Sequence, residues 1–105
     1  MSKLTMLTQM PEVVSVVLGD QMGTLSDAQN EPDAEAVAAV MGYLSSAAKQ
    51  SGEALGFGTA QKVTITGPNK ACVLYIKGTA VVTIYVDPHK SIVGIEKKIE
   101  QALQI

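Results

Sequence analysis

The residues most able to do chemistry in this sequence are one histidine and one cysteine. His89 follows Asp87 and Pro88 at the expected start of a helix, where an imidazole is usually exposed to solvent. Cys72 lies inside an apolar segment, where a thiol usually behaves as a small buried hydrophobic group. A metal site of cysteine and histidine cannot be completed from this pair, and a nucleophilic thiol would have only His89 as its base. We therefore expect no catalytic residue, no metal and no cofactor.

Two glycine-containing segments differ from the loops that bind phosphates. The segment Gly19–Gly23 lacks a Gly-Lys-Ser/Thr ending and leads into a strand-like segment, so we expect a hairpin turn there. Gly52, Gly56 and Gly58 end an expected helix, whereas a dinucleotide-binding fingerprint opens one. The acidic residues also lack the spacing of a calcium loop. The sequence thus predicts a protein that is not an enzyme.

The composition excludes further classes of protein. Of the 105 residues, 47% are hydrophobic and 17% are charged, with a formal net charge of −2. All eight basic residues are lysines, and they are too dispersed to follow a phosphate backbone, so we expect no nucleic acid as partner. The sequence lacks a signal peptide and an apolar run of about 18 residues, so we expect no membrane insertion and a cytoplasmic protein. The length fits a single domain over residues 1–105.

Apolar periodicity and turn residues predict eight elements in the order α-β-β-α-β-β-β-α. They are a short helix ended by Pro11, strands Val13–Leu18 and Thr24–Ala28, a helix capped by Asn30 and running to about Leu55, strands Gln61–Thr66, Ala71–Ile76 and Thr79–Val86, and a helix after Asp87 and Pro88. Pro32 is expected in the first turn of the long helix, and Lys77-Gly78 as the two-residue loop between the last two strands. The order predicts an α+β fold, with helices packed on a five-stranded, mostly antiparallel sheet.

The long helix is unusually poor in charge. The apolar residues expected to face the sheet are Val37, Val40, Met41, Leu44, Ala48 and Leu55. The opposite side holds Ala39, Gly42, Tyr43 and Ser46, and a ridge of small residues recurs every four positions at Ala34, Ala38, Gly42 and Ser46. Such a ridge lets another backbone approach closely. We interpret the outer side as a contact surface for a second copy or another protein; the alternative is that alanine, a good helix former, is simply tolerated on an exposed face.

The order and spacing of several segments resemble the roadblock/dynein light chain superfamily, including its bacterial or archaeal MglB-like members. The matching segments are Leu7–Leu18, Asp20 and Gly23 in the hairpin, Asp33–Ala39 and Gly94–Ile99. The resemblance implies a roadblock/profilin-like fold, with the long central helix on one face of the sheet and the terminal helices on the other. It also implies a homodimer, with the long helices side by side and the sheets joined through the third strand, and a platform for Ras-like small GTPases.

Carried over by position, this resemblance assigns partner contacts to two elements. On the long helix they are Ala38, Ala39, Gly42, Tyr43, Ser46 and Gln50, and on the third strand Gln61, Val63 and Ile65. The expected function is a non-enzymatic homodimeric adaptor that binds a Ras-like small GTPase and influences its nucleotide state or localisation. The alternative is a purely structural self-assembling scaffold module without a GTPase partner.

Overall fold

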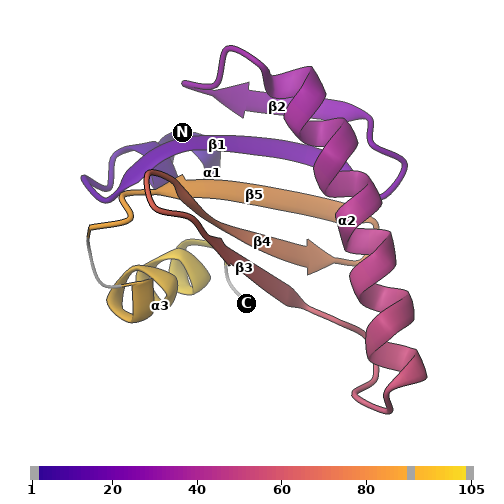
Figure 1. Cartoon of the computed structure of the whole chain (residues 1–105). Coiled ribbons are helices and arrows are strands. Elements are labelled where there is room, and N and C mark those ends of the chain that lie inside the picture. The colour runs from indigo at the N-terminus through magenta and orange to yellow at the C-terminus, as the bar shows by residue number, and fades with distance from the viewer. Residues whose placement is uncertain (1–2, 90–91, 104–105) are drawn as a thin grey trace.

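The computed structural model describes residues 3–89 and 92–103 and contains the eight elements in the predicted order (Figure 1). In chain order they are α1 (Lys3–Thr8), β1 (Val13–Asp20), β2 (Leu25–Gln29), α2 (Ala34–Ala54), β3 (Lys62–Thr66), β4 (Ala71–Lys77), β5 (Ala80–Val86) and α3 (Ile92–Leu103). The fold is α+β, as predicted.

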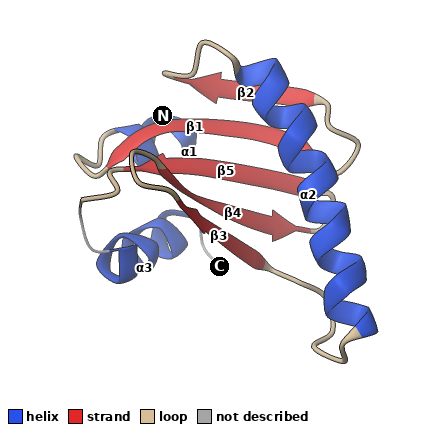
Figure 2. Ribbon diagram, viewed as in Figure 1, coloured by secondary structure: helices blue, strands red, loops and turns tan. Residues whose placement is uncertain are grey.

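The five strands form one sheet in the order β2-β1-β5-β4-β3, and every neighbouring pair is antiparallel (Figure 2). The last strand, β5, lies between β1 and β4 and is the central strand of the sheet. The β1–β2 and β3–β4 hairpins therefore lie at opposite sides of the sheet, which leaves β2 and β3 as its edges. The predicted five-stranded antiparallel sheet is confirmed.

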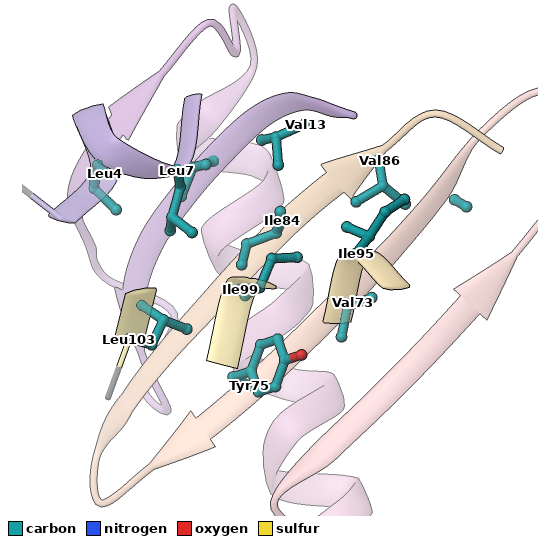
Figure 3. Packing of buried hydrophobic residues seen from close by; sticks show 12 residues of the cluster. Leu4, Leu7, Val13, Val73, Tyr75, Ile84, Val86, Ile95, Ile99 and Leu103 are labelled. Carbon is teal, nitrogen blue, oxygen red and sulfur yellow. The ribbon is translucent and has the colours of Figure 1, made fainter. Parts of the chain in front are cut away.

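The helices form separate layers on the two faces, as the resemblance implied. Figure 1 shows α2 crossing one face of the sheet, with α1 and α3 on the other. The larger core fills the α1/α3 side (Figure 3) and consists of Leu4, Leu7, Val13, Val16, Ala71, Val73, Tyr75, Ile84, Val86, Ile95, Ile99 and Leu103. A smaller core on the α2 side contains Met41, Cys72, Leu74 and Val81. Successive side chains of a strand point to opposite faces, which is why β4 contributes to both cores.

The β4–β5 hairpin loop differs from the expected loop by one residue. Lys77 pairs with Ala80, so the two loop residues are Gly78 and Thr79. Gly78 has φ +61°, a left-handed conformation that glycine adopts without steric cost. Because glycine takes the first loop position, Lys77 remains in β4.

The N-cap of the long helix lies three residues after the expected one. Asn30 has φ +64° and belongs to the turn after β2, while Asp33 is the N-cap residue and Pro32 precedes it. The predictions of a cap at Asn30 and of Pro32 in the first turn are therefore wrong. Asparagine is one of the few residues that tolerate a left-handed conformation, and Asn30 adopts it in the turn after β2. The expected end of the helix at Gly56 (φ +84°) is confirmed.

Candidate interaction surface

Three small residues and Met41, rather than the whole set of large apolar residues, form the buried side of α2. The four buried residues of α2 are Ala38, Met41, Gly42 and Ser45. Val40, which the sequence placed inward, is 61% exposed, and Leu55 is 72% exposed. Val37 and Leu44 are only half-buried. The predicted inner face is therefore wrong in part: α2 is rotated so that its ridge of small residues approaches the sheet.

The cause of this rotation is the β1–β2 turn. A β-carbon added to Gly42 would lie 2.6 Å from the backbone nitrogen of Gly23. The Ser46 hydroxyl donates a hydrogen bond to the Gln21 carbonyl at 3.5 Å. A backbone does approach the ridge closely, as its small side chains predicted, but it belongs to the same chain. The expectation that Ala38 and Gly42 lie on the outer side is therefore wrong, and Ser46 lies half-buried at its margin.

The same turn displays an apolar side chain that the sequence analysis missed. The Asp20 carboxylate accepts hydrogen bonds from the backbone N–H groups of Met22, at 2.9 Å, and Thr24, at 3.0 Å. The Gln21 N–H donates to the Thr79 carbonyl at 3.1 Å, which joins this turn to the β4–β5 loop. Met22 is 89% exposed. Its position follows from the hairpin register, which was not inferred from the sequence.

The outward side of α2 is uncharged along most of the helix. We call its exposed residues the outer face of α2; they are Ala36, Ala39, Val40, Tyr43, Gln50 and Ala54. At 100° per residue these six lie within about 60° of one direction. Ala39, Tyr43 and Gln50 are exposed as expected, and Tyr43 is 78% exposed. The sequence analysis missed Val40 because its hydrophobicity placed it toward the core.

The third strand, β3, is an edge of the sheet, and its two faces differ in chemistry. Val63 and Ile65 pair with Leu74 and Cys72, whose side chains lie on the α2 side, so both face α2. Val63 is half-buried and Ile65 is 42% exposed. Gln61 is exposed just before the strand, and its carbonyl accepts the N–H of Ile76 at 2.9 Å. The structure thus places an exposed apolar edge on the same side of the sheet as α2.

Lys62 and Thr64, on the opposite face of β3, contact α3. The Lys62 ammonium lies 2.9 Å from the Glu96 carboxylate, and the Thr64 hydroxyl donates to the same carboxylate at 3.4 Å. The pKa of Lys62 is raised, chiefly by its hydrogen bond to Glu96. These contacts join segments about 30 residues apart in the sequence, and no local pattern predicted them.

The hollows on the α2 side of the sheet include two that adjoin Tyr85. One, of about 160 Å³, is lined by Met41, Ile65, Lys70, Ala71, Cys72 and Tyr85, and therefore lies between α2 and β3. A larger one, of about 370 Å³, shares Lys70, Ala71 and Tyr85 with it and extends to the β2–α2 loop, where Glu31 and Asp33 form part of its rim. Burial raises the pKa of the Cys72 thiol. Burial also raises the pKa of the Tyr85 hydroxyl, assisted by the charges of Cys72 and Glu31. Both groups are therefore neutral at pH 7, and this concave surface is largely apolar.

The two residues with the greatest potential for chemistry, Cys72 and His89, lie in different surroundings. Cys72 is buried, whereas His89 is exposed and its backbone N–H donates to the Asp87 carboxylate. Within residues 3–89 and 92–103, no cluster of three or more histidine, cysteine or acidic side chains could hold a metal. In the same described segments, no helix is long and apolar enough to cross a membrane.

The sequence matches no protein-family model and no curated protein, but the fold matches known structures. The roadblock/LC7 domain from Streptomyces avermitilis superposes with a TM-score of 0.86 at 17% identity, covering 97% of this chain and 89% of that one. MglB from Myxococcus xanthus gives a TM-score of 0.89 at 18% identity, covering 97% and 86%. A structure of MglB with a tetrameric arrangement gives 0.83 at 13% identity, covering 95% and 79%. The chain therefore has the fold of roadblock/LC7 domains, shared with MglB.

Proposed function

We propose that this protein is a non-enzymatic homodimeric adaptor that binds a Ras-like small GTPase and influences its nucleotide state or localisation. The second copy pairs along the edge of β3 and contacts α2 from that side. The GTPase binds the outer face of α2. This assignment follows the resemblance to roadblock proteins, corrected for the residues that the structure buries.

One observation carries the proposal: α2 presents an uncharged outer face, and the edge strand β3 exposes an apolar side chain on the same side of the sheet. Val40 and Tyr43 are 61% and 78% exposed, and Ile65 on β3 is 42% exposed. Exposed apolar residues that gather into a patch mark contact with another protein more often than a solvated face does. Depletion of charge at the centre is also a compositional signal of protein interfaces.

The comparisons support assembly as a property of this fold. The tetrameric arrangement reported for MglB is formed by a chain whose fold covers 95% of this one. The exposed β3 edge offers a natural pairing site, since an edge strand presents unpaired backbone donors and acceptors.

The absence of arginine from the sequence restricts how such an adaptor could act on a GTPase. An arginine finger, which stabilises charge in the transition state of GTP hydrolysis, cannot come from this chain. Regulation would instead come from tighter binding to one conformation of the GTPase switch segments, because a ligand shifts an equilibrium only by its differential affinity. The alternative, a self-assembling scaffold without a GTPase, predicts dimerisation alone.

The first test is the solution mass, measured by light scattering during size exclusion over a range of concentrations. We expect about twice the 11.0 kDa monomer mass. Ile65→Lys should shift the protein toward monomer, because it places a charge on the edge that pairs. Met6→Lys is a matched control, since Met6 on α1 is 43% exposed, close to the 42% of Ile65, and lies on the other face of the fold. A wild-type monomer, or equal effects of the two variants, would contradict the proposed dimer.

The second test separates the adaptor from the scaffold. A purified Ras-like small GTPase is loaded with GDP or a GTP analogue, and its affinity for this protein is measured by titration calorimetry. We expect a preference for one nucleotide state, and we expect Tyr43→Asp to weaken binding while the protein remains folded. Equal affinity for both states would leave no means of biasing the nucleotide state. Failure of both forms to bind would favour the scaffold.

A further inference from the structure

Lys62 occupies a position where a lysine ordinarily prevents strands from pairing. Charged side chains on edge strands, lysine especially, are a common protection against edge-to-edge association. Lys62 is the first residue of β3, and it pairs with Tyr75 on β4. A free ammonium here would oppose the addition of another strand, because its hydration shell would be disturbed.

Glu96 on α3 neutralises this lysine. Its carboxylate lies 2.9 Å from the Lys62 ammonium, and the two side chains are 18% and 38% exposed. The same carboxylate accepts the Thr64 hydroxyl at 3.4 Å. One side chain of α3 therefore holds two residues of β3 that are two positions apart and lie on the same face of the strand.

The remainder of β3 is weakly anchored by side chains. Val63 is half-buried, and the other four residues of the strand are exposed. The strand is held in register by five residue pairs with β4. An edge strand with so little buried surface can bulge or twist away from a flat conformation, and bulges end strand pairing. A carboxylate that bonds residues 62 and 64 together opposes that distortion.

We propose that Glu96 is a positioning residue for strand addition at β3, so that β3 of a second copy of this chain can pair along the edge. It does so by neutralising Lys62 and by holding Lys62 and Thr64 in one flat segment. This inference rests on the proposed homodimer. Without Glu96, the charge of Lys62 opposes strand addition at this edge, so α3 controls association at β3 through one carboxylate.

The test compares the dimer dissociation constants of four proteins by analytical ultracentrifugation. Glu96→Gln, which keeps the size of the side chain but removes its charge, should raise the constant roughly tenfold, because a twofold dimer contains the contact twice. Lys62→Thr combined with Glu96→Gln should restore most of the affinity, since the lysine charge that opposes strand addition is then absent. Lys98→Met is the matched control: Lys98 makes an ion pair of the same 2.9 Å length from α3 to Glu12, away from β3. We expect it to leave the constant unchanged, and thermal unfolding checks that all variants are folded.

The outcomes distinguish this inference from the proposed function. A monomeric wild type, or a dimer that Ile65→Lys leaves intact, would overturn the proposed mode of dimerisation and this inference with it. A dimer that depends on Ile65 but is unaffected by Glu96→Gln would overturn the inference alone. It would also be overturned if Lys98→Met weakened the dimer as much as Glu96→Gln, or if the double variant failed to recover, because α3 packing would then explain the effect.

Discussion

Gly42 of α2 and Gly23 of the β1–β2 turn are in backbone contact, and neither position has room for a larger residue. A β-carbon on Gly42 would lie 2.6 Å from the nitrogen and 2.7 Å from the α-carbon of Gly23. Gly23 itself has φ +86°, and a β-carbon there would lie 3.1 Å from the α-carbon of Ala39. The helix and the turn therefore fit together only because both residues lack a side chain.

Gly42→Ala is predicted to destabilise the fold, although alanine is the better helix former. The clash with backbone atoms should cost about 3 kcal/mol, the upper end for overpacking; after the gain of about 1 kcal/mol in helix propensity, the net loss is about 2 kcal/mol. Urea unfolding measures the difference. A larger charged residue at position 42 would unfold the monomer, so such a variant cannot report on an interface.

Gly94→Ala provides the matched control in α3. Gly94 is exposed, and a β-carbon there would meet nothing within 4 Å. We expect this variant to stabilise the protein by about 0.5–1 kcal/mol through helix propensity alone. Equal effects of the two substitutions would show that α2 does not contact the turn as described.

The comparison of these glycines shows what the sequence could and could not predict about α2. The central strands of the sheet were predictable because β4 and β5 are largely apolar segments. The end of α2 was predictable because a glycine follows it. The rotation of α2 was not predictable in the same way, because hydrophobicity favours burial of Val40 and says nothing about Gly42. The sequence feature that could have indicated this rotation is the pair Gly19 and Gly23 in the β1–β2 hairpin, because glycines there allow a helix with small residues to pack closely.

The candidate interaction surface was predictable to a similar extent. Ala39 and Tyr43 were placed outward correctly by helical periodicity within the uncharged segment, and Gln50 by the resemblance. The contact of Lys62 with Glu96 was not foreseen, because the residues are far apart in the sequence and each is an ordinary solvated charge by local pattern. Long-range register, rather than composition, determines that pair.

Tyr75→Phe is predicted to leave stability unchanged or to raise it by up to about 1 kcal/mol. The Tyr75 side chain is buried in the core beneath α3 (Figure 3), and within the described residues its hydroxyl has no hydrogen-bond partner. A buried hydroxyl without a partner carries a desolvation penalty that phenylalanine does not. Urea unfolding measures the change, with Tyr43→Phe, at a 78% exposed position, as the near-neutral control. A loss above 1 kcal/mol would show that the hydroxyl is bonded in solution.

Stability is predicted to fall as the pH rises above about 9. Burial raises the pKa of Cys72 above its ordinary value of 9.0 and that of Tyr75 above 10.0. In this range the unfolded chain releases protons that the folded chain retains, so the unfolded state binds fewer protons and the free energy of unfolding decreases with pH. Lys62 acts in the same direction, since its raised pKa reflects a stabilising contact that is lost on deprotonation. Urea midpoints between pH 7 and 11 measure this slope, and Tyr75→Phe should reduce it. A flat profile would contradict the burial of these groups.

Asp20→Ala is predicted to destabilise the β1–β2 turn and, through it, the packing of α2 against that turn. One Asp20 carboxylate oxygen accepts the N–H groups of both Met22 and Thr24, and the loss of such a local cap should cost roughly 1–2 kcal/mol. Asp20→Asn retains an acceptor oxygen and should cost less. Because Gly23 in this turn contacts Gly42, amide hydrogen exchange in the middle of α2 should accelerate in Asp20→Ala beyond the global change. Acceleration confined to residues 20–24 would show that the turn and the helix open independently, so that the small-residue ridge does not couple them.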